Sequence, residues 1–238
     1  MNGGLSYDPA AVVANTANHR VLVLSACAVS FLGAYLQYFG AIRMGFKDRT
    51  HSIPLVGNLW FFAHDTTYVA NFQHWFYQVD FWMVGAFWFA LAVFALCESV
   101  VTYQILRYSR RELFPGMTLA QALAAYGALQ LFTYGLFWSF LATVRDPYYL
   151  LSFATTVVLA PMFNIAMLRS RASRRGFSTS MMLGFVLLTS GFWIWMFAID
   201  GFFRQPLFWL VAGGNVGMSV AGILVFRRLP AYETTERV

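Results

Sequence analysis

The stretch Lys47-Asp-Arg-Thr-His-Ser-Ile-Pro-Leu-Val-Gly-Asn-Leu-Trp-Phe-Phe-Ala-His-Asp-Thr-Thr-Tyr68 starts as a basic turn and becomes apolar after Pro54. In a helix, Asn58, Phe61 or Phe62, and Asp65 share one face, and Asn58 and Asp65 lie about 10 Å apart along the axis. An ionisable group in hydrocarbon costs roughly 3 kcal/mol. We therefore expect Asp65 to face an internal cavity, where the function would reside.

The rest of the chain has the composition of a membrane protein. Of its 238 residues, 59% are hydrophobic and 11% are charged, whereas a soluble domain is about 25% charged. The aromatic content of 19% indicates interfacial belts and an aromatic-lined interior, which suits an apolar or cationic ligand. The net charge of +6 does not indicate nucleic acid, because nearly all arginines lie in short gaps between apolar runs.

Seven apolar runs are long enough to cross a bilayer as helices. We predict an all-α fold, a polytopic membrane protein with a seven-transmembrane-helix bundle. The predicted spans are residues 21–42, 52–70, 79–106, 118–144, 147–168, 179–199 and 206–226. Residues 1–19 form a short N-terminal segment with little order apart from a brief helix starting at Asp8-Pro9, residues 20–228 form the membrane domain, and residues 229–238 form a cytoplasmic tail.

The basic residues predict the orientation of the bundle. Of the 16 lysines and arginines, thirteen follow the first, third, fifth and seventh runs, and three, Arg20, Arg145 and Arg204, lie on the other side. The positive-inside rule then places the N-terminus outside and the C-terminus in the cytoplasm. The membrane would be a bacterial inner membrane or the endoplasmic reticulum.

Two features predict how the helices pack. Pro161 lies inside the fifth run, where it lacks a backbone donor and predicts a kink that frees a carbonyl for a cavity. Gly213, Gly217 and Ala221 form a small-residue ridge that predicts a close helix contact. Ordinary membrane-helix packing accounts for both features equally well.

The acidic residues predict a polar site. Asp80 and Glu98 are eighteen residues apart and so share a helical face, with Phe87, Leu91 and Phe94 between them. Asp65, Asp80 and Asp200 could meet in one outer vestibule, with His64, His74 and Arg145 nearby. Alternatively, Asp80 and Asp200 are solvated at helix ends, and Asp65 and Glu98 make structural bonds between helices.

Metal and cofactor binding are not predicted. His64, Asp65, His74 and Asp80 carry suitable ligand atoms, but their spacing matches no compact metal motif. A haem or metal held by His64 and His74 remains an alternative. Retinal is set aside because a Schiff base needs a lysine inside the bundle, and the single lysine, Lys47, lies in a turn.

Short motifs resemble a known family. The residues from Lys47 to Thr50, then Pro54 and the run from Asn58 to Phe62, resemble the loop and second helix of the seven-helix membrane terpene cyclases. These enzymes act in fungal meroterpenoid and indole-diterpene pathways and have bacterial relatives. The residues from Arg169 to Gly176, which lead into the run from Met181 to Trp195, are similar to the loop before the sixth helix of these cyclases.

The resemblance implies acid catalysis without a metal, in which a glutamate of the second helix and an aspartate of the last helix protonate a polyprenyl epoxide or alkene. Here the corresponding positions hold Phe61 and, by approximate alignment, Asn215. Asp65 lies one helical turn beyond Phe61 and is the first substitute, and Glu98 is the second. The difference could also mean isomerisation, hydration or no catalysis.

We therefore predict a cofactor-independent membrane enzyme that protonates a lipophilic, isoprenoid-type substrate. A carboxyl in a water-poor pocket can act as a general acid, and aromatic faces stabilise a developing carbocation. The catalytic candidates are Asp65 and Glu98, and the substrate-binding candidates are Asn58, Trp60, Phe61, Phe62, His64, Asp80, Tyr134, Trp193, Trp195 and Asn215. The alternative is a non-catalytic lipid or small-molecule binding protein, transporter or sensor, and in either case membrane lipid surrounds the chain.

Overall fold

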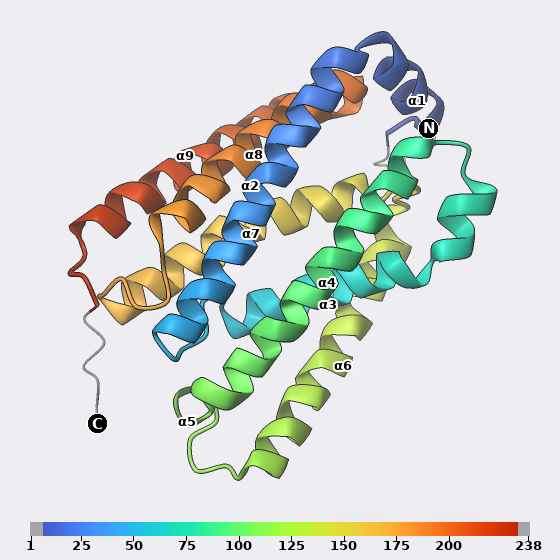
Figure 1. Cartoon of the computed structure of the whole chain (residues 1–238). Helices are drawn as coiled ribbons and strands as arrows, with labels where there is room; N and C mark the ends of the chain where they lie inside the picture. Colours follow the sequence, from blue (N-terminus) through green and yellow to red (C-terminus); the bar gives the residue numbers. More distant parts are fainter. Residues whose placement is uncertain (1–6, 233–238) are drawn as a thin grey trace.

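A computed structural model describes residues 7–232, and this part of the chain is helical with no strand (Figure 1). Six of its helices are long and apolar enough to cross a membrane. They are α2 (Arg20–Lys47), α4 (Trp82–Tyr108), α6 (Leu119–Val144), α7 (Leu150–Arg171), α8 (Thr179–Ile199) and α9 (Pro206–Arg228). The shorter elements are α1 (Pro9–Asn18), α3 (Leu55–Ala70), the π-helical turn η1 (His74–Gln78), α5 (Arg110–Leu113) and the 3-10 turn η2 (Gly201–Arg204).

The helix α3 is shorter than its predicted span. It begins after Pro54 and has 16 residues, which corresponds to about 24 Å, less than the roughly 30 Å of a hydrocarbon core. Half of its residues are buried, including Asn58, His64 and Asp65. The helix is therefore a short element with several buried polar side chains, and it packs against α4, α6 and α7.

The N-terminal segment is more ordered than expected from residue 7 onwards. Asp8 caps α1 by accepting a hydrogen bond from the backbone N–H of Ala10 at 2.9 Å, so the predicted helix start is confirmed. Tyr7 donates to Asp146 at 2.7 Å, and Asn15 donates to the carbonyl of Ile199 at 3.0 Å. These bonds hold the segment against the α6–α7 and α8–α9 connections. Residues 1–6 and 233–238 lie outside the described range.

The basic connections gather at the other end of the molecule. His51, between α2 and α3, donates its backbone N–H to Ser109 at 3.0 Å and accepts from Arg171 through its carbonyl at 2.8 Å. Arg174 donates to the carbonyls of Phe226 and Arg227 at the end of α9. The end of α9 and the helix α1 consequently lie at opposite ends of the fold (Figure 1).

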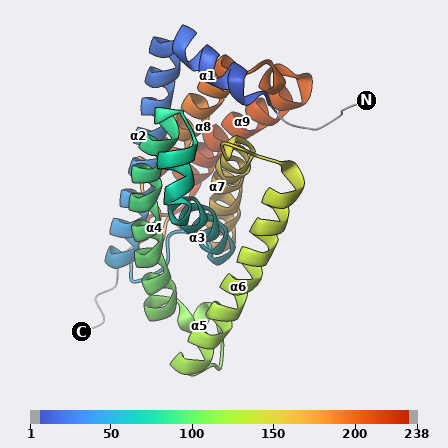
Figure 2. The same ribbon diagram turned by 90° about the vertical axis from the view of Figure 1, so that its right-hand side faces the viewer.

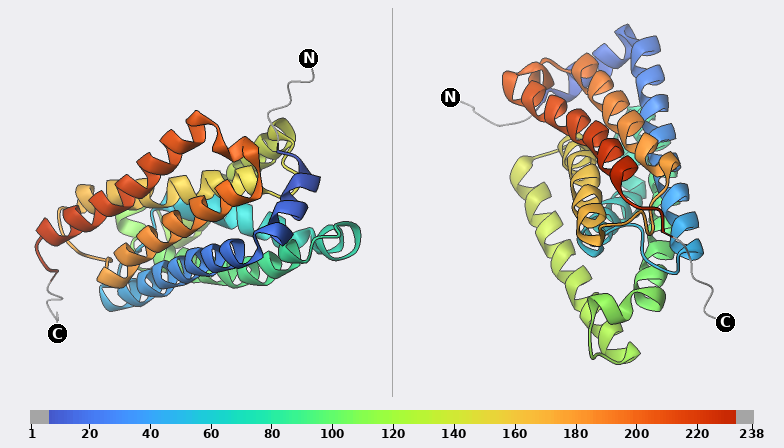
Figure 3. Two further views of the ribbon diagram at one scale, coloured as in Figure 1. Left: turned by 90° about the horizontal axis from the view of Figure 1, so that it is seen from above. Right: turned by 90° about the vertical axis from the view of Figure 1, so that its left-hand side faces the viewer.

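The closest helix pair is α2 and α8, which lie side by side along most of their length (Figure 3). A Cβ atom added at Gly33 would overlap the backbone of Leu188, and one added at Gly184 or Gly191 would overlap the backbone of α2. Glycine is required at these positions because any side chain would push the two helices apart. The predicted ridge on α9 does not have this role, since nothing lies within 4 Å of a Cβ added at Gly213 or Gly217.

The helix α6 leaves the bundle at an angle (Figure 2). Only four of its residues, Ala122, Tyr126, Gln130 and Phe137, are buried. Large apolar side chains such as Leu131 and Phe132 are exposed, as expected for a surface in contact with lipid tails rather than water.

Candidate functional site

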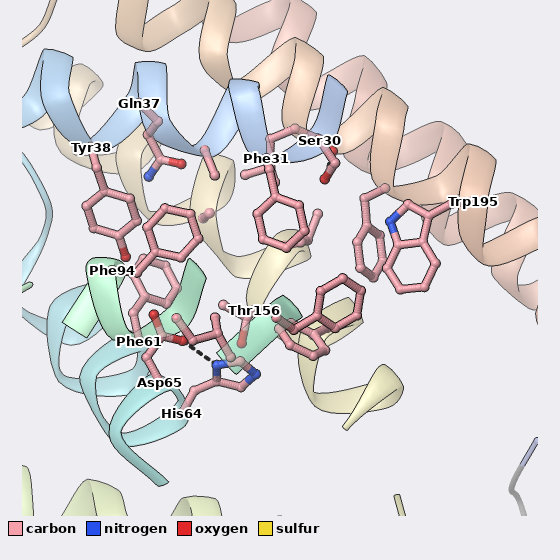
Figure 4. A pocket seen from close by; sticks show the side chains of 18 residues that line it. Ser30, Phe31, Gln37, Tyr38, Phe61, His64, Asp65, Phe94, Thr156 and Trp195 are labelled. Atoms are coloured by element: carbon pink, nitrogen blue, oxygen red, sulfur yellow. Dashed lines mark hydrogen bonds and ion pairs between the residues drawn. The ribbon is translucent and has the colours of Figure 1, made fainter. Parts of the chain in front are cut away.

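A cavity lies between α2, α3, α4, α7 and α8 (Figure 4). The volume in which the centre of a water molecule can lie is about 80 Å³. By the same measure, a site that holds one water has roughly 10–15 Å³. The space therefore admits several waters or a slim hydrocarbon chain. Its lining consists of Ser30, Phe31, Ala34, Gln37, Tyr38, Phe61, His64, Asp65, Phe87, Leu91, Phe94, Phe153, Thr156, Val157, Ala160, Leu188, Phe192 and Trp195.

Eight of the eighteen lining residues are phenylalanine, tyrosine or tryptophan. Phe31 lies 5.4 Å from Phe87 between ring centroids, and Phe87 lies 5.5 Å from Phe153 and 5.9 Å from Trp195. Such rings present electron-rich faces and hydrogen-bearing edges. The cavity therefore suits a flat or extended apolar ligand, and its ring faces can stabilise a passing positive charge.

Asp65 is the acidic side chain in this wall. Its Oδ1 lies 2.5 Å from Nδ1 of His64, the preceding residue of α3 (Figure 4). His64 and Asp65 are both buried, and the imidazole is enclosed by the rings of Phe137, Tyr149 and Phe153. Because the neighbouring rings restrict its movement, His64 fixes one oxygen of the Asp65 carboxyl.

Glu98 of α4 lies near Asp65, close enough for the two carboxyl groups to interact electrostatically. Glu98 Oε1 accepts a hydrogen bond from the hydroxyl of Tyr38 at 2.5 Å. Glu98 is fully buried, and its Oε2 has no hydrogen-bond partner among the described residues. The result is a buried cluster of polar side chains, Tyr38, Glu98, Asp65 and His64, contributed by α2, α4 and α3.

This cluster favours a proton on one of its two carboxyls. Two like charges close together and away from water would repel strongly. A proton on either Asp65 or Glu98 removes this repulsion, so the pair can store a proton next to an apolar space.

Four of the predicted site residues line the cavity: Phe61, His64, Asp65 and Trp195. The predicted face of α4 is also present there, since Phe87, Leu91 and Phe94 line the same wall. Glu98 completes the site through Asp65, although it is not part of the lining.

Asn58 and Trp60 lie outside the cavity lining. The amide of Asn58 donates to Thr102 and Tyr126, both at 2.9 Å, and so ties α3 to α4 and α6. Trp60 donates its indole N–H at 3.2 Å to Thr156, which does line the cavity. Trp60 therefore supports the wall from outside.

Neither Phe62 of α3 nor Tyr134 of α6 lines the cavity. The carbonyl of Phe62 accepts from Thr66, and Thr66 is bonded to the hydroxyl of Tyr134 at 2.6 Å. Tyr134 lines a separate, open hollow with Thr67, Asn71, Trp138 and Tyr149 among its neighbours.

Trp193 and Asn215 have a structural role connected with Pro161. Pro161 cannot donate to the carbonyl of Val157, four residues earlier, and the amide of Asn215 donates to this carbonyl at 3.3 Å. Trp193 in turn donates to Oδ1 of Asn215 at 3.1 Å. Pro161 does free a backbone carbonyl, that of Val157, as predicted. Asn215 donates to this carbonyl, so neither group is available to a ligand in the cavity.

The predicted vestibule of three aspartates does not form. The helix α4 begins at Trp82, so Asp80 precedes it in an exposed connection and does not share the helical face of Glu98. Asp200 caps η2 by accepting from the backbone N–H of Phe202 at 2.6 Å. His74 is bonded to Gln78 at 3.0 Å. Across residues 7–232, no group of three or more histidine, cysteine or acidic side chains has the arrangement of a metal site.

Sequence reasoning missed the contribution of α2. Ser30, Gln37 and Tyr38 line the cavity, yet each appears as a single polar residue in a long apolar run. Their spacing of seven and eight residues places them on one helical face, and this signal could have identified the face.

Comparison with family models, curated proteins and solved structures finds no match for this chain.

Proposed function

We propose that this chain is a membrane enzyme that protonates an isoprenoid-type substrate in the aromatic cavity and needs no cofactor. The observation that carries this proposal is the buried pair of Asp65 and Glu98 beside a largely apolar space. A proton held there faces a ligand that occupies this space. General acid catalysis of this kind contributes about 10²–10⁴-fold to a rate.

In the proposed reaction, the Asp65–Glu98 pair gives its proton to an alkene carbon, and the substrate becomes a carbocation. The rings of Phe87, Phe153 and Trp195 stabilise this charge through their faces. Loss of a proton from a neighbouring carbon to the same carboxylate then restores the enzyme. The net change is an isomerisation or cyclisation, which consumes no second reactant.

The resemblance to the membrane terpene cyclases supports the same chemistry with a shifted acid. Phe61 occupies the family's glutamate position and lines the cavity, and Asp65 lines it one turn further along α3. Asn215, at the family's aspartate position, is engaged by Trp193 and Val157. The proposal therefore assigns proton donation to the α3–α4 pair in place of the two family positions.

We also propose that α3 is a seventh crossing, with the N-terminus outside. The connections after α2, α4 and α7 meet at the basic end through His51, Ser109 and Arg171. The connections after α6 and α8 meet the N-terminal segment at the opposite end. An alternating path of this kind requires α3 to run from one end to the other, and labelling of single cysteines placed in the two sets of loops tests the orientation.

The function is tested by proton transfer to carbon in heavy water. Purified protein in lipid nanodiscs is incubated with a panel of linear prenyl alkenes and prenyl alcohols in D₂O, and products are analysed by mass spectrometry. The expected product carries a new carbon–deuterium bond. Asp65→Asn should slow its formation by about 100-fold or more, because the amide is not an acid.

The matched control is Asp200→Asn, which makes the same chemical change at a carboxyl that caps η2 outside the cavity. This variant should keep its turnover. Full turnover in a folded Asp65→Asn sample would contradict the assignment. Tight retention of a lipid with no deuterium incorporation in the wild-type protein would favour the second candidate, a non-catalytic binding protein, transporter or sensor using the same cavity.

A further inference from the structure

Gln37 is a buried amide that faces the cavity without a partner. Its residue is 2% exposed, and its side chain projects from α2 toward the space beside Tyr38 and Phe94 (Figure 4). No hydrogen bond to this amide exists within residues 7–232. The amide atoms of Gln37 are not among the fully enclosed polar atoms without a partner, so they are open to the cavity and can pair with a water or a ligand there.

The other buried glutamines of the described chain are bonded to the protein. Gln104 donates to the carbonyl of Ile42 at 2.9 Å, and Gln130 donates to the carbonyl of Leu59 at 3.0 Å. Both amides hold two helices together. Gln37 makes no such bond, so helix packing does not account for an amide at this position.

Gln37 lies at the acidic end of the cavity. The next residue of α2, Tyr38, donates to Glu98, and Asp65 lines the same space. Ser30, seven residues earlier and about 10 Å away along the helix axis, already donates its hydroxyl to the carbonyl of Leu188 at 3.1 Å. The amide is therefore an uncommitted hydrogen-bonding group close to the proposed proton donor.

We propose that Gln37 binds a hydroxyl or carbonyl oxygen of the lipophilic ligand and so sets which part of its chain faces Asp65. An amide can donate to either oxygen and can accept from a hydroxyl. The ligand class is then an isoprenoid-type chain with one oxygen function at or near its end, and a pure hydrocarbon is a poorer fit. This inference rests on the proposed function only in placing the ligand in the same cavity.

The test compares binding of two saturated probes, hexahydrofarnesol and farnesane, to purified protein by equilibrium dialysis. The probes share a carbon skeleton and lack an alkene, so neither can be turned over by protonation. The wild-type protein should prefer the alcohol, after correction for partition into detergent, by about ten-fold, which corresponds to about 1.4 kcal/mol. Gln37→Leu should remove this preference.

Gln205→Leu is the matched control, because it makes the same chemical change at an exposed position outside the cavity, and its preference for the alcohol should match that of the wild-type protein. Gln37→Leu should melt at or above the wild-type temperature, since it removes a buried amide that has no protein partner. An alcohol preference that survives in Gln37→Leu, or the absence of a preference in the wild-type protein, overturns the inference. A large loss of thermal stability in Gln37→Leu also overturns it, because the amide would then have a structural role.

The outcome is independent of the test of catalysis. If Asp65→Asn stops deuterium incorporation while Gln37→Leu keeps the alcohol preference, the proposed reaction stands and the role of Gln37 falls. If the alcohol preference depends on Gln37 but no deuterium enters carbon, the cavity is a binding site for oxygenated isoprenoid chains without the proposed reaction.

Discussion

Asn215 illustrates how one polar side chain in an apolar helix can complete the backbone of its neighbour. It donates to the Val157 carbonyl that Pro161 leaves without its helical partner, and it accepts from the indole of Trp193. Both groups lie in an interior where water cannot replace the lost bonds. The amide therefore links α7, α8 and α9 at the point where the helical hydrogen-bond pattern of α7 is broken.

Asn215→Leu should destabilise the protein by about 2–6 kcal/mol, because it leaves a buried carbonyl and an indole N–H unpaired at about 1–3 kcal/mol each. Thermal unfolding in detergent measures the effect. Asn164→Leu is the matched control on α7, since the Asn164 amide donates only to Ala160 of its own helix and its Oδ1 has no partner. Equal losses in the two variants would contradict the role assigned to Asn215.

At the scale of elements, the contact between α2 and α8 depends on the absence of side chains. Gly33→Ala should be strongly destabilising, by about 1–3 kcal/mol or more, because its Cβ would overlap the backbone of Leu188 and a backbone cannot move aside as a flexible side chain can. Unfolding temperature and the fraction of protein that remains monodisperse in detergent provide the measurement.

Gly217→Ala on α9 is the control for this prediction. Nothing lies within 4 Å of its added Cβ, and alanine is a better helix former than glycine by about 1 kcal/mol. This variant should be as stable as the wild-type protein or more stable. A large loss at Gly217 would restore the ridge expected from the sequence and would place an unseen contact on that face of α9.

The long helices could be predicted because apolar runs separated by basic turns are a local signal. The run 179–199 has the bounds of α8, and the other long helices begin and end within a few residues of their predicted spans. The start of α4 was wrong because Phe81 is extended, with φ −147°, so Asp80 was placed on a helical face that does not exist. The π-helical turn at His74–Gln78 has no local signal that we recognise.

The candidate site was only partly predictable, because the cavity is lined by faces of helices that are far apart in the sequence. Asp65 and the Phe87–Leu91–Phe94 face were found, since an acid in an apolar run and a helical period are both visible in a sequence. Gln37 and Tyr38 were missed because each is a single polar residue in a long apolar run, although their spacing from Ser30 places all three on one helical face. Asn215 was misplaced because its partner, the Val157 carbonyl, appears only through the effect of Pro161.

At the scale of the whole molecule, the two ends of the bundle are built differently. The end near α1 is closed by the bonds of Tyr7 and Asn15 to the α6–α7 connection and the end of α8. Burial there raises the pKa of the Asp146 carboxyl, and its hydrogen bonds to Tyr7 and to the backbone of Ser152 partly offset this rise. The opposite end is held by arginines, which donate to loop carbonyls and to His51.

His51 makes the stability of the basic end depend on pH. Burial, and then the positive charges of Arg171 and Arg175, lower its pKa from 6.5 to about 3, and the neutral ring lies 3.0 Å from the Arg171 guanidinium. Between about pH 3 and pH 6.5, His51 binds a proton in the unfolded chain but not in the folded protein. The contribution of neutral His51 to the free energy of unfolding should therefore be fully present above about pH 6.5. It should fall as the pH drops toward 3, by at most about 1.4 kcal/mol per pH unit.

Thermal unfolding between about pH 5 and pH 7 measures this effect. His51→Gln should flatten the dependence, because an amide oxygen can accept from Arg171 and does not titrate. His19→Gln, at an exposed position between α1 and α2, should leave the slope unchanged. If His51→Gln kept the wild-type slope, the acid sensitivity would originate elsewhere, and His51 would bind its proton in the folded state as readily as in the unfolded chain.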